Sequence, residues 1–270
     1  MRALVIKGPK KMNILDVPEV VRNKREVKIA PKYVGICGSD VHGYLGTTGR
    51  RIPPMIMGHE MSGIVIEVGS EVSSFKPGDR VTVQPILYCG QCVYCKQGLI
   101  NICSNRRFLG TMDQNGAFSD EICIEEKNVF HIPDSISDIE GALIEPLAVA
   151  YRAVRQVMPV ENKTVMICGT GAIGLLLLAV VRYFGAGKTI VTDLSDFRLE
   201  IAKKNGADII INPAKQDLKQ ELLENGVYDS IDISFEAVGA TPTAQQTVDY
   251  VRNKGNIVWV GNSAPMVTIN

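Results

Sequence analysis

Four cysteines within fifteen residues constrain this 270-residue chain more than any other feature. Cys89, Cys92, Cys95 and Cys103 follow the spacing C-x2-C-x2-C-x7-C. Four thiolates this close together can complete a tetrahedral shell around zinc. A ferredoxin-type iron–sulfur run places its fourth cysteine after three residues and follows it with proline, whereas seven residues intervene here and serine follows. The spacing therefore predicts a structural zinc, which has no open coordination position and holds a loop together.

The charge balance and the apolar runs exclude several classes of protein. Lys plus Arg number 29 and Asp plus Glu number 29, so the formal net charge is zero and no basic surface for nucleic acid is expected. The longest apolar stretch, Ala172 to Val181, is too short to span a bilayer. The run Ala3 to Ile6 is too short for a signal-peptide core. We therefore expect a cytoplasmic protein without nucleic-acid or membrane partners, in which the seven cysteines are not disulfide-bonded.

The texture of the sequence changes near residue 150, which predicts two domains. Up to about residue 135, short β-branched runs are separated by glycine and proline, a pattern typical of a barrel-like β domain. We expect this domain at residues 1–150, with the zinc lobe at residues 88–104. The strands expected in it are Ala3–Ile6, Val27–Ile29, Gly63–Val68, Asp79–Val83 and Ala117–Ile124.

Strand and helix patterns alternate in the second half of the chain, after a helix expected at Leu147–Val157. This alternation predicts an α/β domain at residues 151–270 with a doubly wound parallel sheet. A full sheet of this type has six strands, so five expected strands leave the domain without its last strand and return segment. The expected strands are Thr164–Cys168, Thr189–Asp193, Ile209–Ile211, Ile231–Phe235 and Asn256–Val260, and the expected helices are Ile173–Phe184, Phe197–Asn205 and Thr243–Val251.

A glycine-rich motif, G-x-G-x-x-G, follows the first strand of this second domain and opens an apolar helix. Such a turn lets a pyrophosphate approach a helix N-terminus. Asp193 ends the next strand, where an acidic side chain can accept hydrogen bonds from both ribose hydroxyls and would repel a 2′-phosphate. The pattern predicts a dinucleotide site that prefers NAD to NADP, and the alternative is a tight turn beside a solvated aspartate. The residues assigned to this site are Gly169, Gly171, Ala172, Ile173, Gly174, Asp193 and Arg198.

Three dispersed segments hold a second set of metal-ligand residue types. Cys37 follows one strand, His59 and Glu60 precede another, and Glu145 stands where the β texture ends. Each has an ordinary structural alternative: a buried small side chain, a turn histidine, or a carboxylate at a helix N-terminus. Together they form a catalytic-type zinc set, in which one coordination position stays open for water or substrate.

The segments G-I-C-G-S-D and G-H-E, the four-cysteine lobe, the glutamate before Pro146 and the nucleotide motif occur in one order along the whole chain. In this order they resemble the zinc-dependent medium-chain alcohol dehydrogenase family. The resemblance implies a GroES-like β-barrel catalytic domain joined to a Rossmann domain, with the active site in the cleft between them. The segment Ile144-Glu-Pro-Leu looks like the polyol dehydrogenases, such as sorbitol and galactitol-1-phosphate dehydrogenases, whose third zinc site is acidic. Either Glu60 or Glu145 can then be the third ligand at rest.

The resemblance further implies two zinc ions per chain and the NAD-dependent oxidation of a secondary hydroxyl. Zinc lowers the pKa of the alcohol, and hydride passes to the nicotinamide. Ser39 matches the hydroxyl relay of the family, and His42 matches the histidine that exchanges the proton with solvent. The alternatives are a turn hydrogen bond for Ser39 and a surface position for His42. The implied substrate is a polyol, a sugar alcohol or its phosphate, with L-threonine or a butanediol as the alternative. A phosphate could be bound by Arg50, Arg51, Arg106 and Arg107.

An alternative of another class is a non-catalytic zinc- and nucleotide-binding protein, inactive through truncation. The resemblance implies a homo-dimer or homo-tetramer for the full-length form. We expect the 270-residue chain, with an open sheet edge, to be a poor catalyst that is prone to associate. Cys123, Cys168 and His131 are expected to be structural, and Trp259 is expected in core packing.

Overall fold

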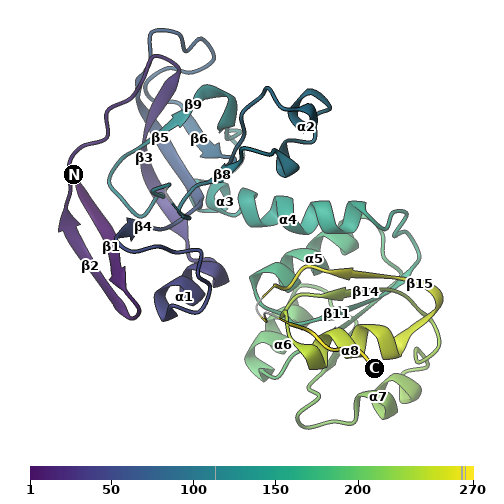
Figure 1. Cartoon of the computed structure of the whole chain (residues 1–270). Helices are drawn as coiled ribbons and strands as arrows, with labels where there is room; N and C mark the ends of the chain where they lie inside the picture. Colours follow the sequence, from purple (N-terminus) through teal and green to yellow (C-terminus); the bar gives the residue numbers. More distant parts are fainter. Residues whose placement is uncertain (113, 263, 265) are drawn as a thin grey trace. The chain divides into compact units, whose positions relative to one another are not determined.

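A computed structural model describes residues 1–112, 114–262, 264 and 266–270 of the chain. These residues form two compact units, residues 1–145 and residues 146–270 (Figure 1). The domain boundary expected at residue 150 falls inside one helix, α4 (Ile144–Arg155). Within the described residues, no helix combines the length and the apolar character needed to cross a membrane.

The first unit is built around an antiparallel sheet of five strands in the order β10-β6-β5-β3-β9. Every second side chain on the central strands is apolar and buried, as Val27 and Ile29, Val81 and Val83 illustrate. This period of two places one face of each strand in a common core. The strands are β3 (Glu26–Gly35), β5 (Glu60–Val68), β6 (Arg80–Val83), β9 (Ile122–Glu125) and β10 (Val129–His131).

The strand predicted over Ala117–Ile124 is wrong in its first half, because the chain there is a loop that precedes β9. The backbone N–H groups of Ala117 and Phe118 donate to the carbonyl groups of Gly58 and Met57. The same unit also contains a smaller antiparallel sheet in the order β2-β1-β4. Its strands are β1 (Arg2–Gly8), β2 (Lys11–Asp16) and β4 (Met55–Ile56).

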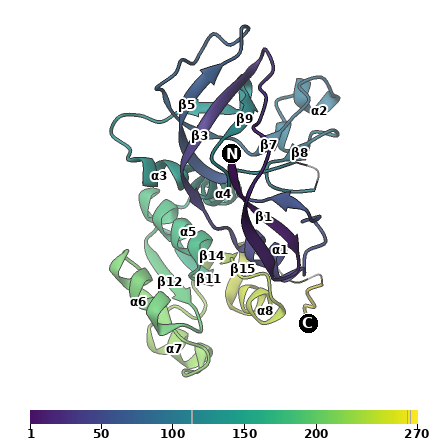
Figure 2. The same cartoon turned by 90° about the vertical axis from the view of Figure 1, so that its left-hand side faces the viewer.

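Short helical segments connect these strands. Figure 2 shows α2 in a lobe beside the small strands β7 and β8. Helix α3 begins with a capping box, in which Ser137 and Glu140 satisfy each other's backbone N–H groups. The segments are α1 (Gly38–Leu45), α2 (Val93–Lys96), α3 (Asp138–Ala142), the 3-10 turns η1 (Ile100–Ile102) and η2 (Glu126–Asn128), and strands β7 (Ile86–Leu87) and β8 (Arg107–Phe108).

The second unit contains a parallel sheet of five strands in the order β13-β12-β11-β14-β15, of which β11, β14 and β15 are labelled in Figure 1. The chain therefore starts in the centre, winds outward to one edge, and returns to wind outward to the other, as in a doubly wound α/β domain. This confirms the fold class predicted from the alternating pattern. The strands are β11 (Thr164–Cys168), β12 (Lys188–Thr192), β13 (Ile209–Ile211), β14 (Ile231–Glu236) and β15 (Val251–Trp259).

Helices cover both faces of this sheet, and the central strand is buried on both sides. Val165 and Ile167 pack with the helices on one face, whereas Met166 and Cys168 pack on the other. Helix α7 was not predicted, because it is a short segment with only Leu218 and Leu222 buried. The helices are α4 (Ile144–Arg155), α5 (Ala172–Tyr183), α6 (Asp196–Lys204), α7 (Leu218–Glu224) and α8 (Thr241–Tyr250).

Candidate active site

The first site in the β unit is assembled where β3 ends and α1 begins. Cys37 is the N-cap residue of α1, and its backbone N–H donates to Asp40 Oδ2 over 3.2 Å. This bond fixes the first turn of α1 and thereby the position of the Cys37 thiol. Gly35 leaves room beside it, because a Cβ atom there would lie 2.3 Å from Glu60 Oε2 and the carboxylate would have to shift. The glycine lets the Glu60 carboxylate approach the end of β3.

The sequence pair His59-Glu60 supplies two further ligand types at the start of β5. Gly58 precedes it with a φ of +95°, a conformation that glycine adopts without strain, so that the chain turns into the strand. The ligand atoms of Cys37, His59 and Glu60 all lie within 4.8 Å of one another. A thiol, an imidazole and a carboxylate at this separation can hold one zinc ion and leave a fourth position open.

Glu145 is the second residue of α4 and stands outside this three-residue set. Burial, together with the negative charges of Glu60 and Asp40, raises the pKa of the Glu145 carboxyl to about 7. Burial also raises the pKa of the Cys37 thiol and of the Glu60 carboxyl. Buried acidic groups that disfavour one another's ionisation lack a countercharge, and a divalent cation supplies it. The donor set therefore fits zinc, and it places Glu60 nearer to Cys37 and His59 than Glu145.

The four-cysteine lobe brings its sulfur atoms into a compact cluster. The Sγ atom of Cys89 lies 3.5 Å from that of Cys103 and 3.9 Å from that of Cys95. Sulfur atoms bound to one zinc at about 2.3 Å would lie about 3.8 Å apart, whereas a disulfide needs about 2.05 Å. Backbone N–H groups of Cys95 and Ser104 lower the pKa of the Cys92 thiol to about 6. The geometry and the thiolate both suit a closed tetrahedral zinc site.

The glycine loop of the second unit joins β11 to α5. Gly169 has a φ of +97°, which places the turn in the region that favours glycine. A Cβ on Gly174 would lie 1.8 Å from the carbonyl oxygen of Gly169, so only glycine allows the helix to start this close to the strand. A Cβ on Gly171 would meet nothing within 4 Å. The loop therefore leaves space at Gly171, on the side where a helix N-terminus attracts an anion.

Asp193 follows β12 and contacts this loop directly. Its Oδ2 atom accepts hydrogen bonds from the backbone N–H of Thr170 over 2.8 Å and from the Thr170 hydroxyl over 3.0 Å. Its Oδ1 atom accepts from the backbone N–H of Ser195 over 2.9 Å. Arg198 Nη1 lies 4.0 Å from Asp193 Oδ2. Ala172 and Ile173 open helix α5, so the residues assigned to the dinucleotide lie on the loop, on the helix it opens, and just beyond the next strand.

The two predicted relay residues, Ser39 and His42, both lie on α1. Ser39 lies in the first turn of α1, two residues after Cys37, and its hydroxyl oxygen accepts a hydrogen bond from Arg51 Nη2 over 2.9 Å. His42 lies in the last turn of α1, with Nδ1 3.3 Å from Thr47 Oγ1. Cys168 is buried, and His131 stacks on Phe75, as expected of structural residues.

Two further expectations need correction. Trp259 was expected in core packing, but 49 % of the residue is exposed and its indole N–H donates to Thr247. The arginines do not act as one phosphate site, because Arg51 is buried in an ion pair with Asp40. Arg107 donates to Gln114, and Arg106 donates to the carbonyl of Cys103. A buried arginine that neutralises a carboxylate is not free to bind a phosphate.

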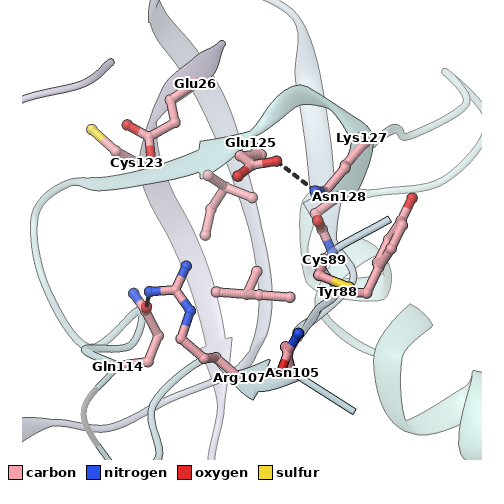
Figure 3. Close-up of a pocket in the computed structure, with 12 residues that line it drawn as sticks. Glu26, Tyr88, Cys89, Asn105, Arg107, Gln114, Cys123, Glu125, Lys127 and Asn128 are labelled. Atoms are coloured by element: carbon pink, nitrogen blue, oxygen red, sulfur yellow. Dashed lines mark hydrogen bonds and ion pairs between the residues drawn. The ribbon is translucent and has the colours of Figure 1, made fainter. Parts of the chain in front are cut away.

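A polar pocket of about 380 Å³ lies between the zinc lobe and strands β3 and β9 (Figure 3). Its charges are balanced: Lys127 pairs with Glu125 over 2.6 Å, and Arg107 shares the pocket with Glu26. Cys89 is the one residue of either cysteine-containing metal set that lines it. The pocket therefore belongs to the structural lobe, and its lining does not include Cys37, His59 or Glu60.

Asp40 and Arg51, which lie close to the candidate ligands, have structural roles that were not predicted from the sequence. A signal for Asp40 exists, because it lies three residues after the N-cap Cys37 in the spacing of a capping box. No comparable signal exists for Arg51, which is brought to Asp40 by the path of the loop after α1.

Comparisons with known proteins agree with this geometry. The alcohol dehydrogenase GroES-like domain matches residues 23–134, and the zinc-binding dehydrogenase domain matches residues 172–270. Sorbitol dehydrogenase of Bacillus subtilis is 40% identical over 264 residues, which are 97% of this chain and 75% of that protein. An Escherichia coli oxidoreductase of unknown specificity has a structure with a TM-score of 0.93 and 36% identity, covering 100% of this chain and 79% of its own. Galactitol-1-phosphate dehydrogenase of Escherichia coli gives a TM-score of 0.90 and 29% identity, with 100% of this chain and 78% of that chain covered. The chain therefore belongs to the zinc-dependent alcohol dehydrogenase family, and it is an oxidoreductase that uses zinc and a nicotinamide cofactor.

Proposed function

We propose that this dehydrogenase oxidises a secondary hydroxyl of a polyol with NAD. The observation that carries the proposal is the convergence of Cys37, His59 and Glu60, whose ligand atoms lie within 4.8 Å of one another. These residues would hold a zinc ion that would lower the pKa of an alcohol in the open position, and a bound nicotinamide would supply the hydride acceptor. The acidic surroundings of this set, with Glu145 and Asp40 close by, favour a divalent cation over a neutral ligand.

Residues of the chain itself bind the metal and move the proton. Cys37, His59 and Glu60 hold the zinc, and Glu145 is the alternative carboxylate ligand. Ser39 takes the alcohol proton on Oγ while its own hydroxyl hydrogen moves on toward solvent, so the serine is neutral before and after the step. His42 passes that proton to bulk water. The cysteines at positions 89, 92, 95 and 103 hold the second zinc, which stabilises the lobe.

We propose NAD rather than NADP as the cofactor. Support comes from Asp193, which is held at the end of β12 by Thr170 and Ser195 with its carboxylate at the glycine loop. A carboxylate in this place accepts hydrogen bonds from ribose hydroxyls and repels a 2′-phosphate. The dinucleotide would then contact Gly169, Gly171, Ala172, Ile173 and Gly174, with Arg198 beside Asp193.

We propose an unphosphorylated polyol as the preferred substrate. The relatives include both a sorbitol dehydrogenase and a galactitol-1-phosphate dehydrogenase, so similarity alone leaves both classes open. The internal ion pair of Arg51 with Asp40 removes one of the four arginines that could bind a phosphate. Polyols without phosphate are therefore favoured over their phosphate esters.

One experiment tests the proposed function directly. Zinc content is measured on the purified chain, and NAD reduction is followed with sorbitol, xylitol, galactitol 1-phosphate, a butanediol and L-threonine. The expected result is two zinc ions and the highest kcat/KM with an unphosphorylated polyol. Highest activity with the phosphate ester, the butanediol or threonine would contradict the substrate class. Preference for NADP would contradict the cofactor.

We also propose a division of roles between the two units, a cellular compartment and an oligomeric state. The first unit is the catalytic domain and the second is the NAD-binding domain, because the two metal sets lie in the first and the glycine loop in the second. A reducing compartment such as the cytoplasm suits seven free cysteines. A homo-oligomer suits β15, an edge strand of its sheet on which Trp259 is half exposed.

A further inference from the structure

Arg51 is a buried arginine beside the candidate zinc ligands, and one of its nitrogens makes two contacts. Its Nη2 atom lies 3.1 Å from Asp40 Oδ1 and donates to Ser39 Oγ over 2.9 Å. The side chains of Arg51 and Asp40 are only 4% and 2% exposed. A buried arginine is costly unless a partner compensates its charge, and Asp40 is that partner. The bond to Ser39 is additional to this compensation.

The fold makes room for the stem of Arg51 at one position of α1. A Cβ on Gly43 would lie 2.4 Å from Arg51 Cγ and 3.0 Å from Met57 Sδ. Gly43 is buried and is followed by the end of the helix. A glycine inside a short helix costs stability relative to alanine. Its presence here lets the arginine stem cross the helix surface and reach Ser39 and Asp40.

The contact with Arg51 decides how the Ser39 hydroxyl can be used. A guanidinium donates hydrogen bonds and accepts none, so Ser39 Oγ must be the acceptor. One lone pair of Oγ is then occupied, which leaves one lone pair and the hydroxyl hydrogen for other partners. Ser39 lies in the first turn of the helix that Cys37 caps, next to the ligand set where the substrate alcohol is expected to bind. The free lone pair can therefore take the alcohol proton while the hydrogen is passed on.

We propose that Arg51 is a positioning residue that orients the Ser39 hydroxyl for proton transfer. The proposal rests on the role given to Ser39 in the proposed function. In each turnover the alcohol O–H bond breaks, a bond forms from that hydrogen to Ser39 Oγ, and the original Ser39 hydrogen leaves toward water. Arg51 keeps its proton throughout and only fixes the direction of the hydroxyl.

Asp40 links this hydroxyl to the metal ligands. Its Oδ1 atom pairs with Arg51, whereas its Oδ2 atom accepts from the backbone N–H of Cys37 and lies 3.9 Å from His59 Nδ1. That Nδ1 atom is buried and has no hydrogen-bond partner among the described residues. Asp40 therefore holds Arg51 in a fixed position relative to Cys37 and His59. Arg51 in turn orients the Ser39 hydroxyl.

The test uses Arg51→Lys in the full chain, with and without Ser39→Ala. Lysine keeps the positive charge that compensates Asp40, but its side chain is one atom shorter and cannot hold the same fork of contacts. The matched control is Arg50→Lys, because Arg50 is the exposed neighbour in sequence. Zinc content, KM for NAD and kcat are measured for each variant.

The expected result is a kcat lowered about tenfold by Arg51→Lys, which is less than the roughly 10²–10⁴-fold that a proton-transfer group itself contributes, because Arg51 only positions that group. Arg51→Lys should leave the zinc content and the KM for NAD unchanged. Arg50→Lys should leave the zinc content, the KM for NAD and kcat unchanged. In the Ser39→Ala background the effect of Arg51→Lys should disappear, because residues that act as one unit are not additive. An equal loss in both backgrounds, or no loss in either, would overturn the proposal.

A second variant tests the positioning without changing any charge. Gly43→Ala places a methyl group against the Arg51 stem and should lower kcat in the same Ser39-dependent way. A Ser39→Ala variant with unchanged turnover would contradict the proton-transfer role in the proposed function itself. If Ser39→Ala abolishes turnover while Arg51→Lys and Gly43→Ala leave kcat unchanged, only the role of Arg51 is refuted.

Discussion

The carboxylate of Asp193 accepts hydrogen bonds from both the backbone N–H and the hydroxyl of Thr170, the residue between Gly169 and Gly171. Two segments that are 23 residues apart in the sequence are thus joined before any ligand binds. The side chain of Asp193 is only 9% exposed. The carboxylate is therefore fixed at the glycine loop, and binding of ribose hydroxyls there requires little reorganisation.

Replacing Asp193 with alanine should weaken NAD binding and narrow the difference between NAD and NADP. A hydrogen bond to a charged group contributes about 1.5–3 kcal/mol, so loss of one ribose contact should raise the Kd for NAD about tenfold or more. Titration of cofactor binding by fluorescence or calorimetry measures both constants.

Asp208 provides the matched control for this variant. Its Oδ2 atom accepts from the backbone N–H and hydroxyl of Thr189 over 2.8 and 2.9 Å, at the opposite end of β12. Asp208→Ala removes an equivalent pair of bonds away from the glycine loop. A similar loss of NAD affinity in both variants would mean that Asp193 acts only by stabilising the fold.

The two glycines of the loop should respond differently to the same substitution. Gly174→Ala should destabilise the second unit, because its Cβ would overlap the carbonyl oxygen of Gly169; overpacking of this kind costs about 1–3 kcal/mol. Gly171→Ala should fold normally, since its Cβ meets nothing within 4 Å, but should weaken NAD binding by filling the space beside the helix N-terminus. Thermal unfolding and NAD titration of both variants separate the two effects. Normal NAD affinity in Gly171→Ala would show that the pyrophosphate does not approach there.

The sequence predicted the second unit more accurately than the first, for a physical reason. In a parallel sheet each strand is a continuous apolar run, and each is followed by a helix with its own pattern, so that β11 was predicted with its observed bounds. The first unit has strands whose pairing is non-local and whose loops carry apolar residues. Ala117 is fully buried although it lies in a loop, and this made the segment resemble a strand.

The candidate ligands could be predicted because each lies in a short motif, but their supporting residues could not. Cys37, His59 and the four-cysteine spacing are local signals of known chemistry. Arg51 reaches Asp40 through a loop whose path depends on Gly43 and on the packing of the barrel. No local pattern encodes such a long-range ion pair, so its role became visible only in three dimensions.

The two metal sets should be separable by single substitutions. Cys37→Ser should lose one zinc ion and turnover while the fold is retained, because the open site has other ligands and does not hold a loop. Cys95→Ser should lose the other ion and lower the thermal stability, since a structural zinc contributes its binding energy to folding. Metal analysis and thermal unfolding measure both. A protein with one zinc ion that Cys37→Ser does not remove would contradict the two-site assignment.

In the zinc-free protein, stability should depend on pH through Glu145. Burial and the charges of Glu60 and Asp40 raise the pKa of this carboxyl to about 7, from an ordinary 4.5. Between about pH 4.5 and pH 7, Glu145 keeps its proton in the folded state but has released it in the unfolded state. The stabilisation is therefore complete below about pH 4.5 and is lost as the pH rises through 7. Because Glu145 is partly exposed, we expect the free energy of unfolding to fall by about 1–3 kcal/mol over this pH range.

Glu145→Gln should remove this part of the pH dependence, and Glu140→Gln is its matched control. Hydrogen bonds from Ser137 lower the pKa of Glu140, so its contribution changes only below about pH 4.5 and with the opposite sign. Chelator-treated samples are compared by thermal unfolding between pH 5 and pH 8. With zinc bound the slope should reverse, because the metal requires deprotonated ligands and binds more tightly as the pH rises. The same slope in wild type and Glu145→Gln would show that this carboxyl is not the group that responds.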